Sequence, residues 1–154
     1  GFLQRNFQGY STYADCDLVA IGVSSIGKIG STYSQNERDI DAYYAALDAG
    51  HLPIMRGYQL NQAAILRRNI IQDLMCRFSL DYQIYESVFG IPFSRYFAAE
   101  LEDMKQLETL GLVHLKPYGL TVTPKGRFLI RNIAMVFDYH LRHKETKAKY
   151  AQTV

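Results

Sequence analysis

The order of segments after residue 61 is the feature that most constrains the fold of this chain. Asn61 is a good N-cap for a first helix, in which apolar residues recur at every fourth position. These residues are Leu66, Ile70, Leu74 and Phe78. A shorter helix is predicted over residues 82–89, ending at Gly90, and a third over about residues 94–110, ending at Gly111. Three helices in succession predict a mainly α region with one packed core.

Two short β-prone runs follow the predicted helices. They cover residues 112–115 and 120–123, and a turn that contains Pro and Gly joins them. Thr123 is predicted to be the N-cap of a last helix. Pro124 would occupy the first helical position, where the N–H that proline lacks has no partner within the helix. The apolar residues expected along this helix are Phe128, Leu129, Ile133, Val136 and Phe137. Three helices followed by a two-stranded hairpin are the order of a winged-helix domain.

The first third of the sequence has a different pattern. Residues 18–23 form a continuous apolar run, which is typical of a strand buried on both faces. A loop rich in Gly and Ser follows. The spacing of Ser34 and Glu37 then predicts a capping box that opens a helix ending at Gly50. Strand, loop and helix make one βα unit, and the rest of its sheet must come from elsewhere.

Composition limits the class of protein. Hydrophobic residues make up 48% of the chain and charged residues 21%, which predicts a packed core, while a net charge of +2 is too small to indicate a polyanionic partner. No apolar run approaches the roughly 20 residues that cross a bilayer, and no signal-peptide pattern occurs, so a cytoplasmic protein is expected. Cys16 and Cys76 lie in apolar segments without metal-ligand spacing and are predicted to be buried thiols. The opening lacks an initiator Met, which suggests a piece of a longer protein.

Residues 22–28 have the G-x-x-x-x-G-K frame of a phosphate-binding loop and follow the strand-like run. The next residue of such a loop must be Ser or Thr to hold Mg²⁺, and here it is Ile29. The helix that should cradle the phosphates is also predicted to begin too late, near Gln35. Nucleotide hydrolysis is therefore disfavoured, whereas a glycine loop that lets backbone approach another ligand is retained.

The winged-helix order raises the hypothesis of DNA binding through the third helix. Between residues 94 and 111 the sequence has four acidic residues against two basic ones, and phosphates repel a helix of net negative charge. A scaffold or partner-binding role is therefore favoured over a nucleic-acid partner. The four histidines do not form a ligand set, because His140 and His143 are the only close pair and no third ligand lies nearby in sequence.

Several segments, in the expected order, resemble the C-terminal portion of the oxygen-independent coproporphyrinogen III dehydrogenase (oxidase) family, whose members are radical S-adenosylmethionine (SAM) enzymes. They span nearly the whole chain, and their joint occurrence is specific although no single motif is. These segments are R5-N-F-Q-G-Y10, D17-L18, G22-V-S-S-I26, Y33-S-Q-N36, R56-G57, R67-R68, L74-M-C-R-F78 and T123-P-K-G-R-F-L-I-R-N-I133.

The resemblance implies a mainly α (α+β) fold in two parts: a βα unit from the edge of a radical SAM barrel at residues 1–55, and a winged-helix-like, substrate-covering domain at residues 56–154. It implies that the full-length, monomeric enzyme uses SAM and a [4Fe–4S] cluster to convert two propionates of a porphyrinogen to vinyl groups. The cluster-binding C-x-x-x-C-x-x-C motif does not occur in this sequence. The chain alone is thus expected to be inactive and to need the missing N-terminal barrel and the porphyrinogen as partners, with no nucleic acid and no membrane.

The resemblance also implies cofactor-binding residues. Phe7, Gln8 and Ile26 match positions that line a second SAM molecule in the family, and an aromatic, an amide and an apolar side chain suit that role. No catalytic or metal-binding residue is assigned. From charge alone, Arg5 and Lys28 are hypothetical partners of substrate propionates. Two alternatives stay open: a winged-helix module that binds nucleic acid or protein, and a haem-carrying relative of the same family without dehydrogenase activity.

Overall fold

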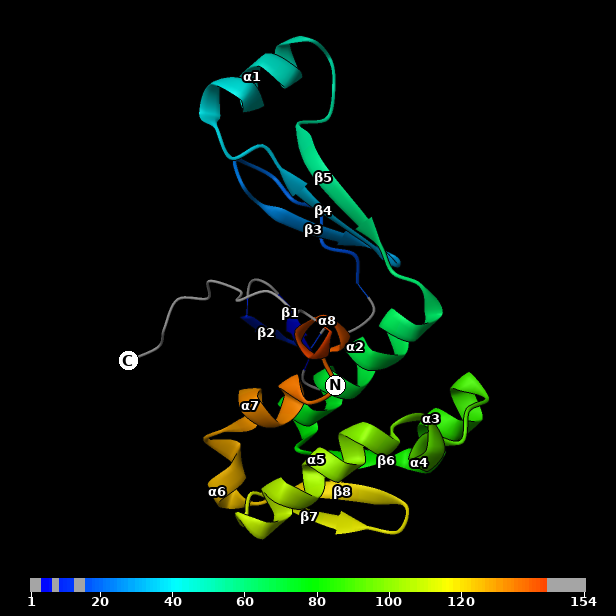
Figure 1. Ribbon diagram of the computed structural model, residues 1–154. Helices are drawn as coiled ribbons and strands as arrows, with labels where there is room; N and C mark the ends of the chain where they lie inside the picture. The colour runs from blue at the N-terminus through cyan, green and yellow to red at the C-terminus, as the bar shows by residue number, and fades with distance from the viewer. Residues whose placement is uncertain (1–3, 7–8, 13–15, 144–154) are drawn as a thin grey trace. The chain divides into compact units, whose positions relative to one another are not determined.

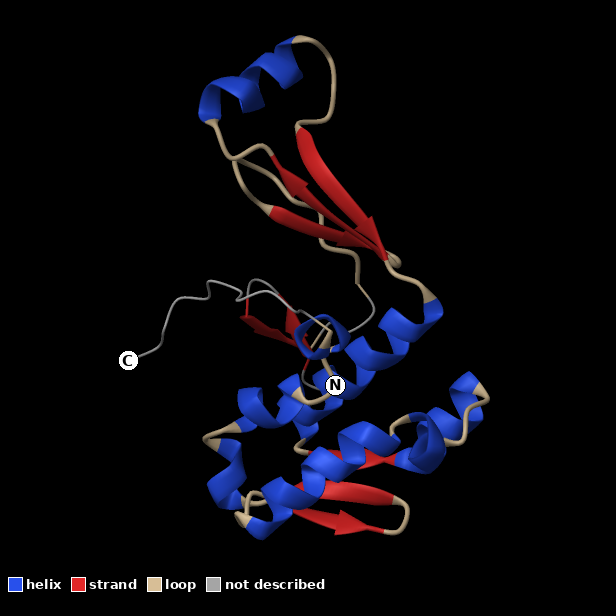
Figure 2. Ribbon diagram, viewed as in Figure 1, coloured by secondary structure: helices blue, strands red, loops and turns tan. Residues whose placement is uncertain are grey.

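In the computed structural model, residues 4–6, 9–12 and 16–143 are described, and the chain divides into two compact units between Ile65 and Leu66. The division falls within helix α2 (Gln62–Arg77), and each unit is described here by itself. Figure 1 labels the elements in chain order, and Figure 2 shows that both units contain helices and strands. Mixed helix and sheet content is therefore confirmed.

The first unit is built around a three-stranded antiparallel sheet. Strands β3 (Ile26–Ile29) and β4 (Thr32–Asn36) form a hairpin, and β5 (Ile54–Gln59) pairs with the other edge of β4. Helix α1 (Ile40–Asp48) lies in the connection between β4 and β5 (Figure 1). A separate hairpin joins β1 (Gln4–Asn6) to β2 (Gly9–Ser11).

The predicted βα unit is wrong in its details. The apolar run at residues 18–23 is not a buried strand: Leu18 makes one isolated bridge to Lys28, and the side chains of Val19 and Ile21 are 69% and 85% exposed. The predicted glycine loop is instead the β3–β4 hairpin, because Gly30 adopts a φ of +56° at its tip.

The predicted capping box at the start of α1 is also wrong. Ser34 is paired within β4, and the helix begins later, where the Oδ1 of Asp39 accepts a hydrogen bond from the N–H of Ala42 at 3.0 Å. The predicted end is close to the observed one, since α1 ends at Asp48 and Gly50 follows with a φ of +74°.

The second unit is mainly helical and contains a small sheet. After α2 come β6 (Ser79–Asp81), α3 (Tyr82–Phe89), α4 (Phe93–Tyr96), α5 (Ala98–Thr109), β7 (Val113–Lys116), β8 (Gly119–Val122), α6 (Pro124–Arg127), α7 (Ile130–Met135) and α8 (Tyr139–Arg142). The antiparallel sheet has the order β6-β8-β7, so the predicted hairpin gains a third strand from between α2 and α3.

Most element boundaries of this unit match the sequence-based predictions. The Oδ1 of Asn61 accepts a hydrogen bond from the N–H of Ala64 ahead of the unit, and Gly90 ends α3 with a φ of +65°. The predicted third helix is broken at Phe97, and the predicted last helix is three short ones. The ring of Phe128, expected to be buried, is 91% exposed because the chain turns between α6 and α7.

The core of the second unit is centred on aromatic rings. Phe93 stacks on Tyr82 with ring centroids 4.2 Å apart and also contacts Phe97 at 4.7 Å. Phe97 in turn meets Phe137 edge-on at 5.5 Å. These three Phe side chains have no exposed surface. The rings tie α3, α4 and the end of α7 into one core.

Close backbone packing explains the glycine at the start of α6. Thr123 caps this short helix, and its Oγ1 accepts a hydrogen bond from the N–H of Gly126 at 3.0 Å. A Cβ atom at Gly126 would lie 2.0 Å from the carbonyl oxygen of Leu112, so no side chain fits there. The turn therefore anchors α6 against the backbone of Leu112, directly before β7.

Two further sequence-based expectations concern cysteines and membranes. Cys16, outside the described helices and strands, is exposed, so the prediction of a buried thiol is wrong there, while Cys76 is half-buried against the core of the second unit. Within the described ranges, none of the helices has the length and apolar character needed to cross a membrane.

Candidate functional site

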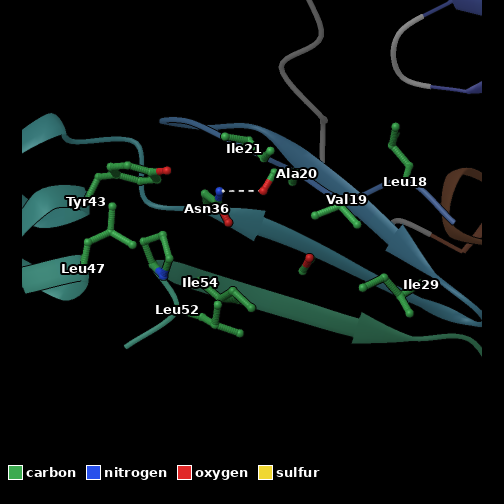
Figure 3. Close-up of a pocket in the computed structure, with 13 residues that line it drawn as sticks. Leu18, Val19, Ala20, Ile21, Ile29, Asn36, Tyr43, Leu47, Leu52 and Ile54 are labelled. Atoms are coloured by element: carbon green, nitrogen blue, oxygen red, sulfur yellow. Dashed lines mark hydrogen bonds between the residues drawn. The ribbon is translucent and has the colours of Figure 1, made fainter. Parts of the chain in front are cut away.

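One buried amide organises the loop that leads into β3. Asn36 ends β4 with only 4% of its surface exposed. Its Nδ2 donates hydrogen bonds to the carbonyl oxygen of Gly22 at 3.0 Å, to the Oγ of Ser25 at 3.2 Å and, more weakly, to the carbonyl oxygen of Ala20 at 3.5 Å. Figure 3 shows the contact with Ala20. A single side chain therefore fixes residues 20–25, which contain a turn at residues 22–24, ahead of β3.

The same loop is held by a second layer of contacts. The Oγ of Ser25 donates to the carbonyl oxygen of Gly22 at 2.7 Å, and the hydroxyl of Tyr43 accepts from the N–H of Gly22 at 3.1 Å. Gly22 has a φ of +100° and Ser24 a φ of +59°. The loop thus contains two residues with positive φ. Glycine adopts such a conformation easily, but at Ser24 it is unfavourable and is sustained by the hydrogen bonds around it.

Gly27 lets the loop lie against the sheet. A Cβ atom there would approach the carbonyl oxygen of Leu18 at 3.0 Å and the Cβ of Ala20 at 3.2 Å. Backbone hydrogen bonds between Leu18 and Lys28, of 2.7 and 2.8 Å, hold this approach on both sides. The glycine predicted to admit close backbone contact does so, but toward the protein's own chain.

An apolar cavity of about 300 Å³ opens between this loop, the sheet and α1 (Figure 3). Its lining is apolar apart from the side chains of Ser34, Asn36 and Tyr43, which sit on the sheet and helix sides. Such a cavity suits an apolar group with few directional contacts. The described part of the chain contains no cluster of three or more His, Cys, Asp or Glu residues arranged to hold a metal ion.

The site residues predicted from the sequence fall in different places. Phe7 and Gln8 lie outside the described residues. Ile26 begins β3, opposite Gln35, and its side chain is half-buried at the end of the organised loop. Arg5 belongs to β1, and Lys28 is a half-buried member of β3. The assignment of Phe7, Gln8 and Ile26 to a cofactor stays a prediction.

Sequence reasoning missed the residue that organises this loop. Asn36 appears in the sequence only as a polar residue near an expected helix start, and its role depends on a hairpin that was not predicted. A second polar pair lies next to it: the Oε1 of Gln35 accepts from the Nε and Nη2 of Arg56 at 2.9 and 2.6 Å, across neighbouring strands. Both contacts become visible only when the strand register is known.

The second unit contains a buried ion pair. The Nη1 of Arg67 donates to Glu100 at 2.8 Å and to the carbonyl oxygen of Phe137 at 3.1 Å, and the two side chains are 14% and 6% exposed. The guanidinium also lies over the ring of Phe97, 5.0 Å from its centroid. Arg67 therefore links α2, α5 and the end of α7, which is a structural role.

Two buried tyrosines have shifted acidity. Burial, and secondarily the charge of Glu108, raises the pKa of Tyr82 to about 12. Burial also raises the pKa of Tyr85, whose hydroxyl donates to the Oδ2 of Asp73 at 2.5 Å. Both hydroxyls stay protonated at neutral pH, so neither suits a general base.

Comparison with known proteins identifies what the chain resembles. Residues 60–129 match the family described as the HemN C-terminal domain. A protein from Pseudomonas aeruginosa named oxygen-independent coproporphyrinogen III oxidase is 47% identical over 141 residues, which cover 92% of this chain and 31% of that protein. The protein of the same name from Synechocystis is 42% identical over all of this chain and 34% of its own length.

A solved structure gives the same result. The coproporphyrinogen III oxidase HemN from Escherichia coli, described as a radical SAM enzyme, matches with a TM-score of 0.88 at 42% identity, over 90% of this chain and 32% of that one. The chain thus spans about a third of the length of the relatives it matches. The resemblance to the C-terminal portion of these proteins, expected from the sequence, is confirmed.

Proposed function

We propose that this chain is the C-terminal portion of an oxygen-independent coproporphyrinogen III oxidase, and that the longer protein converts two propionates of coproporphyrinogen III to the vinyl groups of protoporphyrinogen IX. In each conversion the propionate loses a hydrogen atom, an electron and CO₂. The observation that carries the proposal is the similarity over nearly the whole chain, at 47% identity to one relative and a TM-score of 0.88 to another.

A [4Fe–4S] cluster and SAM, when bound, supply the radical chemistry that removes the hydrogen atom. This chain does not fit the cluster, because its two cysteines, Cys16 and Cys76, are too far apart in sequence to form a ligand motif. The cluster ligands therefore belong to the remaining two thirds of the protein. The half-buried side chain of Ile26, at the end of a loop held by Asn36, suits an apolar contact with SAM.

The second unit is proposed to cover the substrate as a winged-helix-like domain. Its three-stranded sheet β6-β8-β7 and the preceding helices have the element order of that fold. A closed aromatic core gives the unit the rigidity that a cover needs to exclude water from a radical intermediate. The domain limits of residues 1–55 and 56–154, the monomeric state and the cytoplasmic location stay predictions.

The nucleic-acid alternative is disfavoured by the acidic side chains of α5. Glu100 holds Arg67, Glu102 pairs with Lys105 and Asp103 pairs with Arg142, so these acids are part of the folded structure. A recognition helix needs free basic groups for phosphates. The haem-carrying alternative would lack second-SAM contacts such as those expected of Phe7 and Gln8, and it is separated from the proposed enzyme by its activity.

The proposal is tested with the full-length parent protein, reconstituted with its cluster under anaerobic conditions. We expect SAM-dependent formation of protoporphyrinogen IX from coproporphyrinogen III. The 154-residue chain alone should show neither iron–sulfur absorbance nor SAM cleavage. Haem binding without turnover by the reconstituted parent would refute the proposal in favour of the haem-carrying relative.

One variant tests the predicted second SAM contact. Gln8→Ala in the parent protein is expected to lower turnover and leave the iron content unchanged, because the amide would contact a cofactor and not the cluster. Turnover equal to that of the unaltered parent would remove Gln8 from the site.

A further inference from the structure

Arg68 differs from its neighbour Arg67 in that its Nε and Nη1 atoms have no hydrogen-bond partner among the described residues. Both residues lie in α2, beside the buried positions Leu66 and Ile70. The Nε and Nη1 of Arg68 are shielded from solvent, and no described residue accepts a hydrogen bond from either atom. The side chain as a whole is half-buried, so part of it stays accessible from outside.

Such an arrangement is costly unless something completes it. A guanidinium keeps its proton at any physiological pH, so it cannot avoid the cost of burial by becoming neutral. Buried donors that are charged and unpaired are among the most unfavourable groups in a protein interior. The position therefore calls for an acceptor that carries a negative charge.

The described part of the second unit has no carboxylate to spare. Each acidic residue among its described positions already has a partner: Asp73 (Tyr85 and Arg77), Asp81 (the N–H of Gln83), Glu86 (the N–H of Phe93), Glu100 (Arg67), Glu102 (Lys105), Asp103 (Arg142), Glu108 (the N–H of Leu115) and Asp138 (the N–H of His140 and of Leu141). Moving any of them to Arg68 would break a cap or an ion pair. The missing acceptor must come from outside the described residues of this unit.

We propose that Arg68 is a carboxylate-binding residue and that its ligand is a propionate of the tetrapyrrole substrate. The proposal rests on the proposed function, which supplies a substrate with several propionate side chains. A carboxylate that reaches the accessible part of the Arg68 side chain brings the negative charge that its guanidinium lacks among the described residues. An acidic side chain from the rest of the parent protein has the same chemistry, and the experiment separates the two sources.

The experiment uses the full-length parent and two stable probes, coproporphyrin III and its tetramethyl ester, which has no carboxylates. Dissociation constants are measured by fluorescence for the unaltered protein, for Arg68→Gln and for Arg95→Gln, a control at an exposed arginine of the same unit. We expect Arg68→Gln to bind the acid about 10- to 100-fold more weakly, the range of a charge-assisted hydrogen bond. Binding of the ester should not change, and Arg95→Gln should behave like the unaltered protein.

Thermal unfolding without ligand separates the two sources of the carboxylate. If the ligand is the substrate, Arg68 is unpaired in the free protein, so Arg68→Gln should leave the Tm unchanged or raise it, and the rise in Tm caused by coproporphyrin III should shrink. If the partner is an acidic side chain of the protein, Arg68→Gln should lower the Tm of the free protein. That lowering, with equal loss of acid and ester binding, would overturn the proposal.

The failure of this inference is distinguishable from failure of the proposed function. An unaltered parent that neither binds coproporphyrin III nor converts the porphyrinogen would contradict the function itself. A parent that does both, with an Arg68→Gln variant that binds the acid as tightly, would remove only Arg68 from the site.

Discussion

The two units of the chain differ sharply in how they bury apolar surface. Every buried hydrophobic side chain of the core lies between Leu66 and Phe137, in the second unit. In the first unit, among the residues whose burial is described, only Gly27, Asn36 and Pro53 are buried. Helix α1 contributes no buried residue, and all six residues of β5 are exposed.

The difference indicates which unit of the chain can fold without the rest of the parent protein. The second unit has a closed core of packed rings, as an independently folding domain has. The first unit exposes large apolar side chains on its sheet, its loop and its helix: Val19, Ile21, Ile29, Ile40, Tyr44, Leu47, Leu52, Ile54, Met55 and Tyr58. Apolar surface of this extent is typical of a contact surface. We therefore expect the first unit to depend on the rest of the parent protein, and the second not to.

The largest effect is expected from a substitution that disrupts the closed core of the second unit. Phe93→Ala removes a ring with no exposed surface that contacts Tyr82 and Phe97, so it should lower the free energy of unfolding of the second unit by about 3–5 kcal/mol. The measurement is chemical denaturation of the 154-residue chain. Phe128→Ala is the matched control, since its ring is 91% exposed and the change should stay below about 0.5 kcal/mol. Equal effects would contradict the assigned core.

The next effect tests the buried ion pair. Glu100→Ala leaves the guanidinium of Arg67 buried without its carboxylate and should lower the free energy of unfolding by about 3 kcal/mol. Glu102→Ala breaks the exposed pair with Lys105 and should cost no more than about 0.5 kcal/mol. Denaturant titrations of the two variants give the comparison, and a small loss in Glu100→Ala would show that Arg67 finds another acceptor.

A third change tests whether the exposed apolar surface of the first unit is covered in the full-length parent. Ile21→Ser replaces a side chain that is 85% exposed in this chain, so in the 154-residue protein it should change the free energy of unfolding by less than about 0.5 kcal/mol. In the full-length parent, where we expect this surface to be covered, the same change should cost about 1–2 kcal/mol. The 154-residue protein and the full-length parent serve as controls for each other in parallel thermal melts. Equal effects in both would mean that the apolar surface stays open to solvent.

The smallest effect concerns pH. The pKa of Tyr82 is raised from its ordinary value of 10.0 to about 12, so the folded protein holds this proton more tightly than the unfolded one. The stabilisation that the Tyr82 hydroxyl contributes to the folded state is fully present below pH 10 and is lost as the pH rises through about 12. Urea unfolding at about pH 9 and about pH 11 should therefore show a smaller loss of stability in Tyr82→Phe than in the unaltered chain.

Tyr85 also has a raised pKa, so Tyr82→Phe should flatten the pH dependence only in part. Tyr118→Phe, at a ring that is 68% exposed, is the control and should follow the unaltered chain. A Tyr82→Phe variant that loses stability as steeply as this control would show that Tyr82 ionises as freely in the folded protein as in the unfolded one.

The sequence predicted the second unit better than the first, for a physical reason. Its helix ends are marked by local chemistry, such as the cap at Thr123 and the left-handed glycine at Gly90, and these signals act within a few residues. The strand β6 was missed because three residues carry no periodic signal, and its pairing with β8 is a long-range contact. The break at Phe97 was missed because tertiary burial of the ring overrides helix propensity.

The first unit could not be derived in the same way. Its apolar run at residues 18–23 is typical of a buried strand, yet Ile21 is exposed. We expect the rest of the parent protein to cover this run. Neither the role of Asn36 in organising the loop nor the lack of described partners for the Nε and Nη1 of Arg68 is visible from the sequence. Each is defined by which partners it has or lacks in three dimensions, and not by its neighbours in the chain.

Strand β5 has one more consequence. Among the described residues it pairs with β4 alone, and its exposed side chains include those of Ile54 and Met55. A free, apolar strand edge is a template for intermolecular pairing. Two copies of the chain that meet through this edge would extend each other's sheet, so the polypeptide produced alone is expected to self-associate as its concentration rises.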